Sequence, residues 1–154
     1  MSCAICDANS GKQRISPGPV IFAGKYWNVE HAYPASLLGW VVVVLGRHCE
    51  ELHSLTFPEW EEFGRIQHQL LHAIVECLAT EREYLACFAE KAQFRHIHFH
   101  VVPKTLDFDP QYVGTKAFHY INADLADVLE PGVVASFCLR LAQFFPGGGS
   151  YPPR

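Results

Sequence analysis

The stretch Arg95-His96-Ile97-His98-Phe99-His100-Val101-Val102-Pro103-Lys104 alternates histidines with apolar residues and closes at a proline. This period-two pattern of Ile, Phe and Val is typical of a β-strand. Residues two apart in a strand share a face, so we expect a histidine face and a core face. The expected histidine face is His96, His98 and His100, and the expected core face is Ile97, Phe99 and Val101.

Three aligned imidazoles are difficult to explain by packing alone, because each buried ring nitrogen needs a hydrogen-bond partner. The residues themselves leave three interpretations open. One histidine could act as a nucleophile that its neighbours hold in one tautomer. Two or three could bind a catalytic metal with an open coordination position. The set could also sense pH, since imidazole titrates near neutrality.

The run from His96 to Val102 matches His-φ-His-φ-His-φ-φ, with φ apolar, at every position. This is the signature of the histidine-triad superfamily of nucleotide hydrolases and transferases, and Pro103-Lys104 resembles the Pro-Arg or Pro-Lys that commonly follows it. The chain therefore resembles a divergent member of this superfamily, from the branch that binds zinc. The resemblance covers most of the chain before about residue 110.

The size and composition favour one globular domain. The chain has 154 residues, of which 49% are hydrophobic, so it can bury a sizeable core. Only 18% are charged and the net charge is −4, which argues against binding a nucleic-acid backbone. We find no signal-peptide pattern and no membrane-length apolar run, and we therefore expect a cytoplasmic location. Six cysteines are then expected to be reduced or metal-bound.

The remaining pattern predicts strands at 19–23, 26–33, 40–46 and 84–89, with 40–46 central and buried on both faces. It predicts a long helix at 58–80, capped by Thr56 and Glu59, and a final helix at 131–145. Residues 104–114 are expected to be irregular, and 124–129 to form one or two helical turns. This pattern suggests an α+β fold with an antiparallel sheet.

The resemblance implies the histidine-triad fold, a five-stranded antiparallel sheet packed with one long helix and one or more shorter ones. We expect a single domain over residues 1–146, with a C-terminal extension from about 105, and a flexible tail at 147–154. The expected apolar face of the long helix is Trp60, Phe63, Ile66, Leu70, Ala73, Ile74 and Cys77. That of the final helix is Val134, Phe137, Leu141 and Phe144.

The resemblance also assigns roles to the triad. The middle histidine, His98, is the expected nucleophile, which attacks the α-phosphorus of a dinucleoside polyphosphate or nucleoside phosphoramidate. The products are a nucleotidyl-histidine intermediate and, after hydrolysis, a nucleoside monophosphate. His100 is a candidate donor to the phosphoryl oxygens, and His96 completes the catalytic set. A main-chain carbonyl or a carboxylate is expected to fix the tautomer of His98.

Some branches of the superfamily carry structural zinc, and the corresponding positions here are Cys3, Cys6, His48 and His96. Two cysteines and two histidines form a closed tetrahedral site. Such a zinc would tie the N-terminus to the triad strand without acting as the Lewis acid. We expect no organic cofactor.

Several positions depart from the superfamily pattern. The usual ribose-binding Asp or Asn is His31 here, the usual Gly-His before the central strand is Gly39-Trp40, and the usual Ser or Thr near the triad is Gln93. We expect Gln93, His31 and Ile5 to contact the substrate. A glycine-rich run is replaced by residues 89–92, in which Lys91, or the later Arg95, could contact phosphate or remain solvated.

Two rival functions stay open from the sequence. One is a non-catalytic nucleotide-binding or scaffolding module of the same fold, and the other is a metalloenzyme built on the three triad histidines. The expected partners are a small nucleotide and a second copy of the chain, with neither nucleic acid nor membrane. His68 and His72, four apart on the long helix, are expected to be solvated or packed rather than metal ligands.

Overall fold

The computed structural model describes residues 2–121 and 124–147. Five antiparallel strands form one sheet in the order β1-β2-β3-β5-β4. The expected flexible tail lies outside the described residues, apart from Gly147. The strands are β1 (Phe22–Ala23), β2 (Trp27–His31), β3 (Val41–Leu45), β4 (Arg82–Ala86) and β5 (His98–Lys104). This is the expected α+β architecture, with the valine-rich β3 at the centre.

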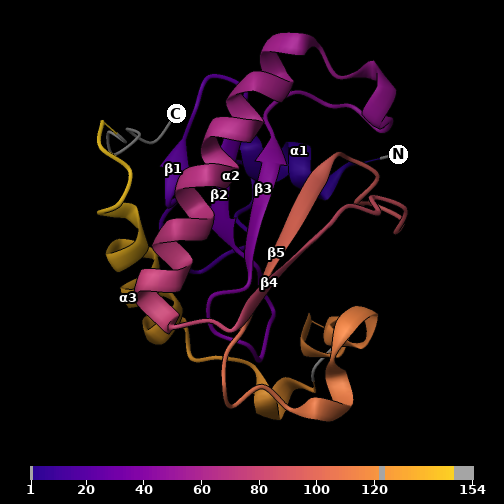
Figure 1. Cartoon of the computed structure of the whole chain (residues 1–154). Coiled ribbons are helices and arrows are strands. Elements are labelled where there is room, and N and C mark those ends of the chain that lie inside the picture. The colour runs from indigo at the N-terminus through magenta and orange to yellow at the C-terminus, as the bar shows by residue number, and fades with distance from the viewer. Residues whose placement is uncertain (1, 122–123, 148–154) are drawn as a thin grey trace.

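Two helices cover one face of the sheet, α2 (Phe57–Leu78) and α3 (Pro131–Ala142), as Figure 1 shows. Their side chains meet the core face of the strands, where Phe63 of α2 lies 4.2 Å, ring centroid to centroid, from Phe99 of β5. The core face of β5 is as expected, because Ile97, Phe99 and Val101 are all buried. The other face of the sheet is left for the histidines and the short helix α1 (Ala4–Asn9).

The long helix begins where its capping sequence predicts. The backbone N–H of Thr56 donates to a carboxylate oxygen of Glu59 at 2.7 Å, and Pro58 lies in the first turn, where a missing N–H costs little. Ala79, with φ 48°, ends the helix in the left-handed region. The expected apolar face is buried except at Trp60, which is 37% exposed. Trp60 still belongs to the apolar face, with its ring 5.8 Å from that of Phe63 and 6.1 Å from that of Phe99, but it lies at the rim of the helix–sheet contact.

Several boundaries differ from expectation. Strands β1 and β2 are shorter than the predicted 19–23 and 26–33, and β4 spans Arg82–Ala86 rather than 84–89. Strand β5 begins at His98 rather than His96, since the N–H of His96 bonds to the Phe94 carbonyl in a local bend. The final helix ends at Ala142, and the chain then turns so that Phe145 rather than Phe144 is buried. Phe145 stacks on Phe22 with ring centroids 5.1 Å apart, and this contact explains why Phe145 is buried in place of Phe144.

Short helical segments complete the chain. Helix α1 was not expected, because six residues are too few to show a period. The segment expected to be irregular contains the 3-10 turn Pro110–Tyr112, and it is followed by the 3-10 helix Gly114–Ile121. The expected turn near 124–129 is the 3-10 turn Leu125–Asp127. None of the helices in the described residues has the length and apolar character needed to cross a membrane.

Glu59 gives the fold a measurable pH dependence. Arg47 donates to both carboxylate oxygens, at 2.6 and 3.0 Å, and this hydrogen bonding lowers the pKa of Glu59 to about 2 despite its burial. A carboxyl with a depressed folded pKa stabilises the fold above its unfolded pKa of about 4.3, and loses that contribution as pH falls toward the folded value. The contribution is therefore complete at neutral pH and disappears on acidification.

We expect Glu59→Gln to lower the free energy of unfolding by roughly 1–3 kcal/mol at pH 7. The difference from wild type should shrink steadily between pH 5 and pH 3. Urea unfolding at a series of pH values measures it, with Glu61→Gln, an exposed neighbour on the same helix, as the matched control. A difference that is the same at pH 7 and pH 3 would show that charge on Glu59 is not the cause.

Candidate functional site

The strand register places a carboxylate and two histidines on one face. Val42 of β3 pairs with Glu30 of β2 on one side and with His100 of β5 on the other, so these three side chains share a face. Val44 pairs with His98, two residues along, on that same face. The site therefore rests on three adjacent strands of the sheet, a rigid platform opposite the helices.

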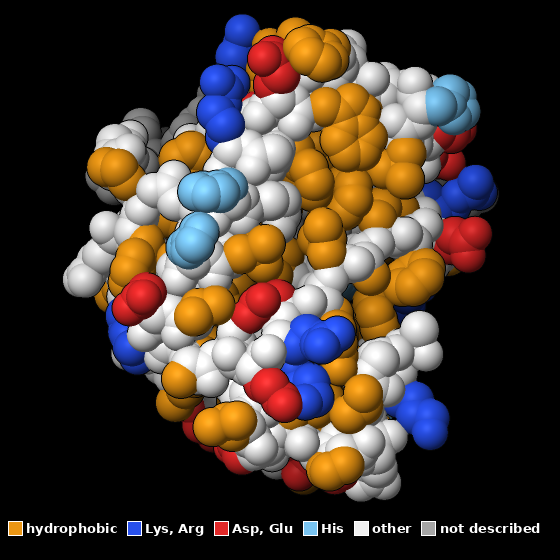
Figure 2. Space-filling view, in the orientation of Figure 1, with side chains coloured by type: hydrophobic (Ala, Val, Ile, Leu, Met, Phe, Trp, Pro, Cys, Tyr) orange, Lys and Arg blue, Asp and Glu red, His pale blue; other side chains and the backbone are white. Residues whose placement is uncertain are grey.

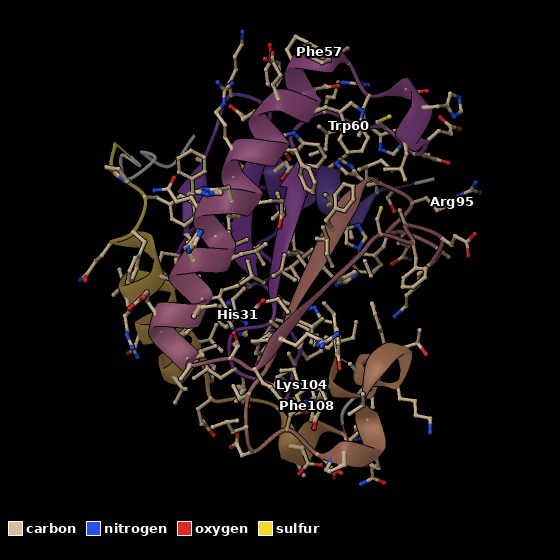
Figure 3. The ribbon with its side chains drawn as sticks, viewed as in Figure 1. His31, Phe57, Trp60, Arg95, Lys104 and Phe108 are labelled. Carbon is tan, nitrogen blue, oxygen red and sulfur yellow. The ribbon has the colours of Figure 1, made fainter. Side chains whose placement is uncertain are left out.

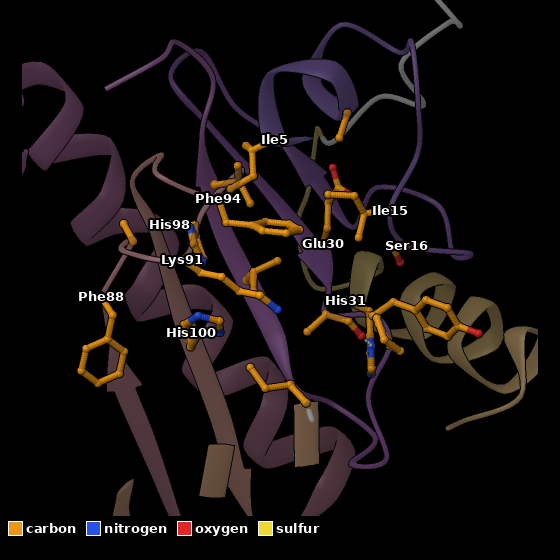
Figure 4. Close-up of a pocket in the computed structure, with 18 of the residues that line it drawn as sticks. Ile5, Ile15, Ser16, Glu30, His31, Phe88, Lys91, Phe94, His98 and His100 are labelled. Atoms are coloured by element: carbon orange, nitrogen blue, oxygen red, sulfur yellow. Dashed lines mark hydrogen bonds between the residues drawn. The ribbon is translucent and has the colours of Figure 1, made fainter. Parts of the chain in front are cut away.

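A cavity of about 370 Å³ lies over this face. Its floor includes His98, His100 and Glu30, and Figure 4 shows Ile5 of α1 along its upper wall and Phe94 across its centre. Ile5 is 5% exposed and lines the cavity, as expected of an apolar substrate contact. The volume suits a small ligand of nucleotide size.

The ring of His98 is held in one tautomer by the backbone. Its Nδ1 lies 2.7 Å from the carbonyl oxygen of His96. A carbonyl can only accept, so Nδ1 carries the proton and donates it, and Nε2 keeps its lone pair. Burial lowers the pKa of His98, which keeps the ring neutral near pH 7. Nε2 is thus left with a free lone pair, and the group that orients the ring is the main-chain carbonyl of His96.

The ring of His100 is also held in one tautomer. The indole Nε1–H of Trp40 donates to Nδ1 of His100 at 3.1 Å, and an indole nitrogen can only donate. The neutral ring of His100 therefore carries its proton on Nε2. Burial, with a smaller effect from His98, lowers the pKa of His100 to about 3. Trp40, a departure from the superfamily pattern, thus sets the tautomer of a triad histidine.

His31 is a lining residue of the cavity, but its ring packs toward the core. It lies on the core face of β2, with its ring 5.9 Å from that of Phe137 in α3. Both ring nitrogens are used: Nδ1–H donates to the Ala32 carbonyl at 2.7 Å, and the N–H of Gly39 donates to Nε2 at 2.9 Å. His31 therefore fixes the turn before β3, although it was expected to stand in for a ribose-binding carboxylate.

Glu30, one position before His31, presents a carboxylate on the cavity face. Its side chain lies on the cavity face and is 9% exposed. Burial raises the pKa of Glu30, and Arg14 at 3.5 Å opposes that shift. The signal was present in the sequence, because Trp27 and Val29 mark the core face of this strand, and the residue between Val29 and His31 must face the other way.

Gln93 does not reach the cavity wall. It is exposed, with φ 69°, and its carbonyl accepts from the N–H of Ala4 at 2.8 Å. The same loop instead sends Lys91 and Phe94 into the cavity wall. Arg95 points elsewhere and pairs with Glu50 at 3.2 Å. Of the two cations considered from the sequence, only Lys91 lines the site.

A second cluster lies beside the triad, where Cys3, Cys6, His48 and His96 bring their ligand atoms within 4.8 Å of one another. Sγ of Cys6 lies 3.4 Å from Nδ1 of His48 and 3.5 Å from Nδ1 of His96, and Sγ of Cys3 lies 3.5 Å from that same atom. Tetrahedral zinc with bonds of about 2.0–2.3 Å places its ligands roughly 3.3–3.8 Å apart. The four residues therefore fit the metal expected from the sequence.

The outer partners of this cluster also suit a metal. Nε2 of His96 lies 2.7 Å from the Leu45 carbonyl, so Nε2 carries the proton and Nδ1 turns its lone pair toward the thiols. Nε2 of His48 lies 3.4 Å from a carboxylate oxygen of Glu50. Within residues 2–121 and 124–147, no other group of three or more metal-ligating side chains comes together. The ring of His96 thus belongs to the cluster, and its carbonyl serves His98.

The three triad rings do not converge on one point. His96 faces the thiols, His98 is tied to a carbonyl, and His100 accepts from Trp40. This arrangement gives no support to a catalytic metal held by all three rings. His68 and His72 are exposed on α2, with ring centroids 4.8 Å apart, and no third ligand joins them among the described residues.

Comparisons with known proteins identify the fold. No family model matches the chain, and no curated protein matches it. Solved structures do match. A hypothetical histidine triad nucleotide-binding protein from Sulfolobus tokodaii is 13% identical, with a TM-score of 0.69 over 92% of this chain and 91% of that one. A histidine triad protein from Sinorhizobium meliloti is 14% identical, with a TM-score of 0.66 over 84% and 90%.

A third match is a zinc-bound histidine triad family protein from Mycobacterium smegmatis, which is 20% identical, with a TM-score of 0.61 over 93% of this chain and 95% of that one. All three matches cover at least 84% of this chain and at least 90% of the other. The chain therefore has the histidine-triad fold, and residues 96–102 match the His-φ-His-φ-His-φ-φ pattern.

Proposed function

We propose that this protein is a nucleotide hydrolase or transferase that cleaves at the α-phosphate through a nucleotidyl-histidine intermediate on His98. The observation that carries this proposal is the hydrogen bond from Nδ1–H of His98 to the His96 carbonyl at 2.7 Å. It leaves Nε2 as a neutral nucleophile on a ring that lines the cavity. The candidate substrates are dinucleoside polyphosphates and nucleoside phosphoramidates.

The first chemical step joins Nε2 of His98 to the α-phosphorus and breaks the bond to the leaving group. The ring becomes positively charged on bonding, and the His96 carbonyl stabilises that charge through the proton on Nδ1. Nε2–H of His100 donates to a phosphoryl oxygen as negative charge develops there. One such donor in a water-poor site contributes about 10²–10³ in rate. Water then attacks the phosphorus, releases the nucleoside monophosphate and restores His98.

The nucleoside fits the side of the cavity formed by α1 and β2. Glu30 presents a carboxylate on the cavity face, which suits hydrogen bonds from ribose hydroxyls. Ile5 of α1 and Ile15 offer apolar surface for a base. We assign the ribose contact to Glu30 in place of His31.

Zinc has a structural role in this proposal. Cys3, Cys6, His48 and His96 would hold it, and the bound metal would supply a cross-link between α1 and the residues that precede β5. Each of the six cysteines is a free thiol, which is compatible with the reducing cytoplasm as the proposed location.

The direct test offers purified protein diadenosine tetraphosphate and an adenosine phosphoramidate and follows AMP release. An acid-quenched reaction, digested and weighed by mass spectrometry, should contain an adenylyl adduct on the peptide that includes His98. AMP release without any adduct would favour direct attack by water. Nucleotide binding without turnover on either substrate would favour the non-catalytic binding module.

We also propose that the protein is a homodimer through α2 and the edge strand β4. Phe57 is 75% exposed, Trp60 37% and Leu85 49%. Figure 2 shows a broad hydrophobic patch beside α2, and Figure 3 places Phe57 and Trp60 at one end of that helix. Strand β4 ends the sheet with an unpaired edge.

Light scattering at micromolar concentration should report about twice the 17.3 kDa chain mass. Trp60→Glu should shift the protein toward monomer, whereas Leu139→Glu, at an exposed leucine of α3, should not. A wild-type protein that stays at the mass of one chain would rule out this dimer.

A further inference from the structure

The loop between β4 and β5 holds Lys91 in a defined place. Two non-glycine residues with positive φ flank it, Ala89 at 51° and Gln93 at 69°. This conformation is unfavourable for residues with a Cβ, so the surroundings must hold it. Ala89 is buried, the Gln93 carbonyl accepts from Ala4, and the N–H of Phe94 bonds to the Lys91 carbonyl at 2.8 Å. The loop is thus fixed on both sides of the lysine.

The Lys91 side chain lies in the cavity wall with its charge uncompensated. Figure 4 shows it reaching from the loop past His98 toward the middle of the cavity. Its Nζ lies 5.7 Å from the centroid of the Phe94 ring, a distance at which an aromatic face attracts a cation. In the described part of the chain, no carboxylate lies within the 4.0 Å of an ion pair with it.

Lys91 is also the only lysine or arginine among the described residues that line the cavity. The histidines beside it are held through Nδ1, His98 by the His96 carbonyl and His100 by the Trp40 indole. Glu30 on the far wall is acidic. A polyphosphate that enters this cavity therefore meets the ammonium group of Lys91, on the same lining as His98.

We propose that Lys91 binds the phosphates beyond the one that His98 attacks, and so makes the site select dinucleoside polyphosphates over nucleoside phosphoramidates. This inference rests on the proposed function and names its substrate class. The transferred nucleotidyl group is the same in both classes, so only a contact to the leaving group can distinguish them.

The leaving groups of the two substrate classes require different stabilisation when the bond to phosphorus breaks. In a polyphosphate, the α-phosphorus–oxygen bond breaks, its electron pair stays on the departing oxygen, and the nucleoside polyphosphate leaves as an anion that needs a positive charge. In a phosphoramidate, the phosphorus–nitrogen bond breaks, and the nitrogen needs a proton from an acid or water to leave as an amine. An ammonium group at Lys91 meets the first need, whereas a phosphoramidate offers it no second phosphate.

The test compares kcat/KM for diadenosine tetraphosphate and adenosine phosphoramidate in wild type, Lys91→Met and Lys91→Arg. Lys91→Met should lower the value for the tetraphosphate about 100-fold and leave that for the phosphoramidate within about 3-fold. Lys91→Arg should restore most of the loss. The matched control is Arg95→Met, which removes the same charge from the same loop outside the cavity, and it should change neither value by more than about 3-fold.

An equal loss on both substrates would overturn the inference, as would no loss on either, or the same loss in Arg95→Met. If wild type turns over neither substrate, the proposed function fails, and a binding comparison still decides the role of Lys91. Calorimetry with ATP and AMP should then show tighter binding of ATP, and Lys91→Met should abolish that preference. A preference that survives in Lys91→Met, or no preference in wild type, would refute the role of Lys91.

Discussion

Replacing His98 with alanine will lower AMP release from the better of the two adenylyl substrates by at least about 10³-fold. The ring nitrogen that bonds to phosphorus disappears, and no other imidazole can take its place. Nδ1 of His100 is occupied by Trp40, and the ring of His96 faces Cys3 and Cys6. The adduct on the triad peptide should vanish in the same variant. Steady-state kinetics and mass spectrometry measure the two effects.

The control for this experiment is His72→Ala, which removes an exposed imidazole from α2, far from the triad face. It should keep wild-type kinetics. Circular dichroism and thermal melting should show that His98→Ala is folded, because the position is only partly buried. If the variant is folded and keeps most of the activity, His98 is not the nucleophile, and the proposed chemistry must be abandoned.

Removing the metal cluster should produce the largest change in stability. We expect the purified protein to contain about one zinc per chain, and Cys6→Ser to contain none. A structural zinc contributes its binding free energy to the folded state, so Cys6→Ser should melt at least roughly 10 °C lower than wild type. Elemental analysis by mass spectrometry and a thermal melt measure the two quantities. A strong chelator added to wild type should reproduce the shift.

Cys87→Ser is the matched control, because Cys87 is a partly buried thiol outside the cluster. It should keep the zinc content of wild type, and a chelator should lower its melting temperature as much as that of wild type. A wild-type protein that binds no zinc under reducing, metal-replete conditions would show that the four side chains cluster for packing alone. So would a melting temperature that is indifferent to the chelator.

The sequence predicted most of the platform of the site, for a physical reason. Alternation along β5 assigns Ile97, Phe99 and Val101 to the core without reference to any other strand. The valines of β3 and the capping residues Thr56 and Glu59 carry similarly local information. The cysteine–histidine cluster was predicted from the resemblance to the superfamily and from the spacing of the two cysteines. That prediction required only that the N-terminus lie near β5.

The parts that the sequence did not predict depend on contacts between distant segments. His31 was aligned by its distance from a proline, whereas the register of β2 on β3 places Glu30 on the cavity face. Gln93 was aligned in the same way. The loop that holds it bends at Ala89 and Gln93, and neither residue type signals a positive φ. The loop shape comes instead from the hydrogen bond between the Gln93 carbonyl and the N–H of Ala4, 89 positions earlier, which no local pattern reveals.

The side chain and the main chain of His96 have separate roles. Its imidazole belongs to the metal cluster, but what it gives to His98 is a peptide carbonyl, which every amino acid possesses. The nucleophile therefore places no chemical demand on the side chain at this position. Without Cys3 and Cys6 there is no metal cluster for the imidazole of residue 96 to join. The side chain at position 96 could then change while the main-chain carbonyl continued to orient His98. Under the proposed mechanism, position 96 is thus the triad position whose side chain can change without altering the attacking ring.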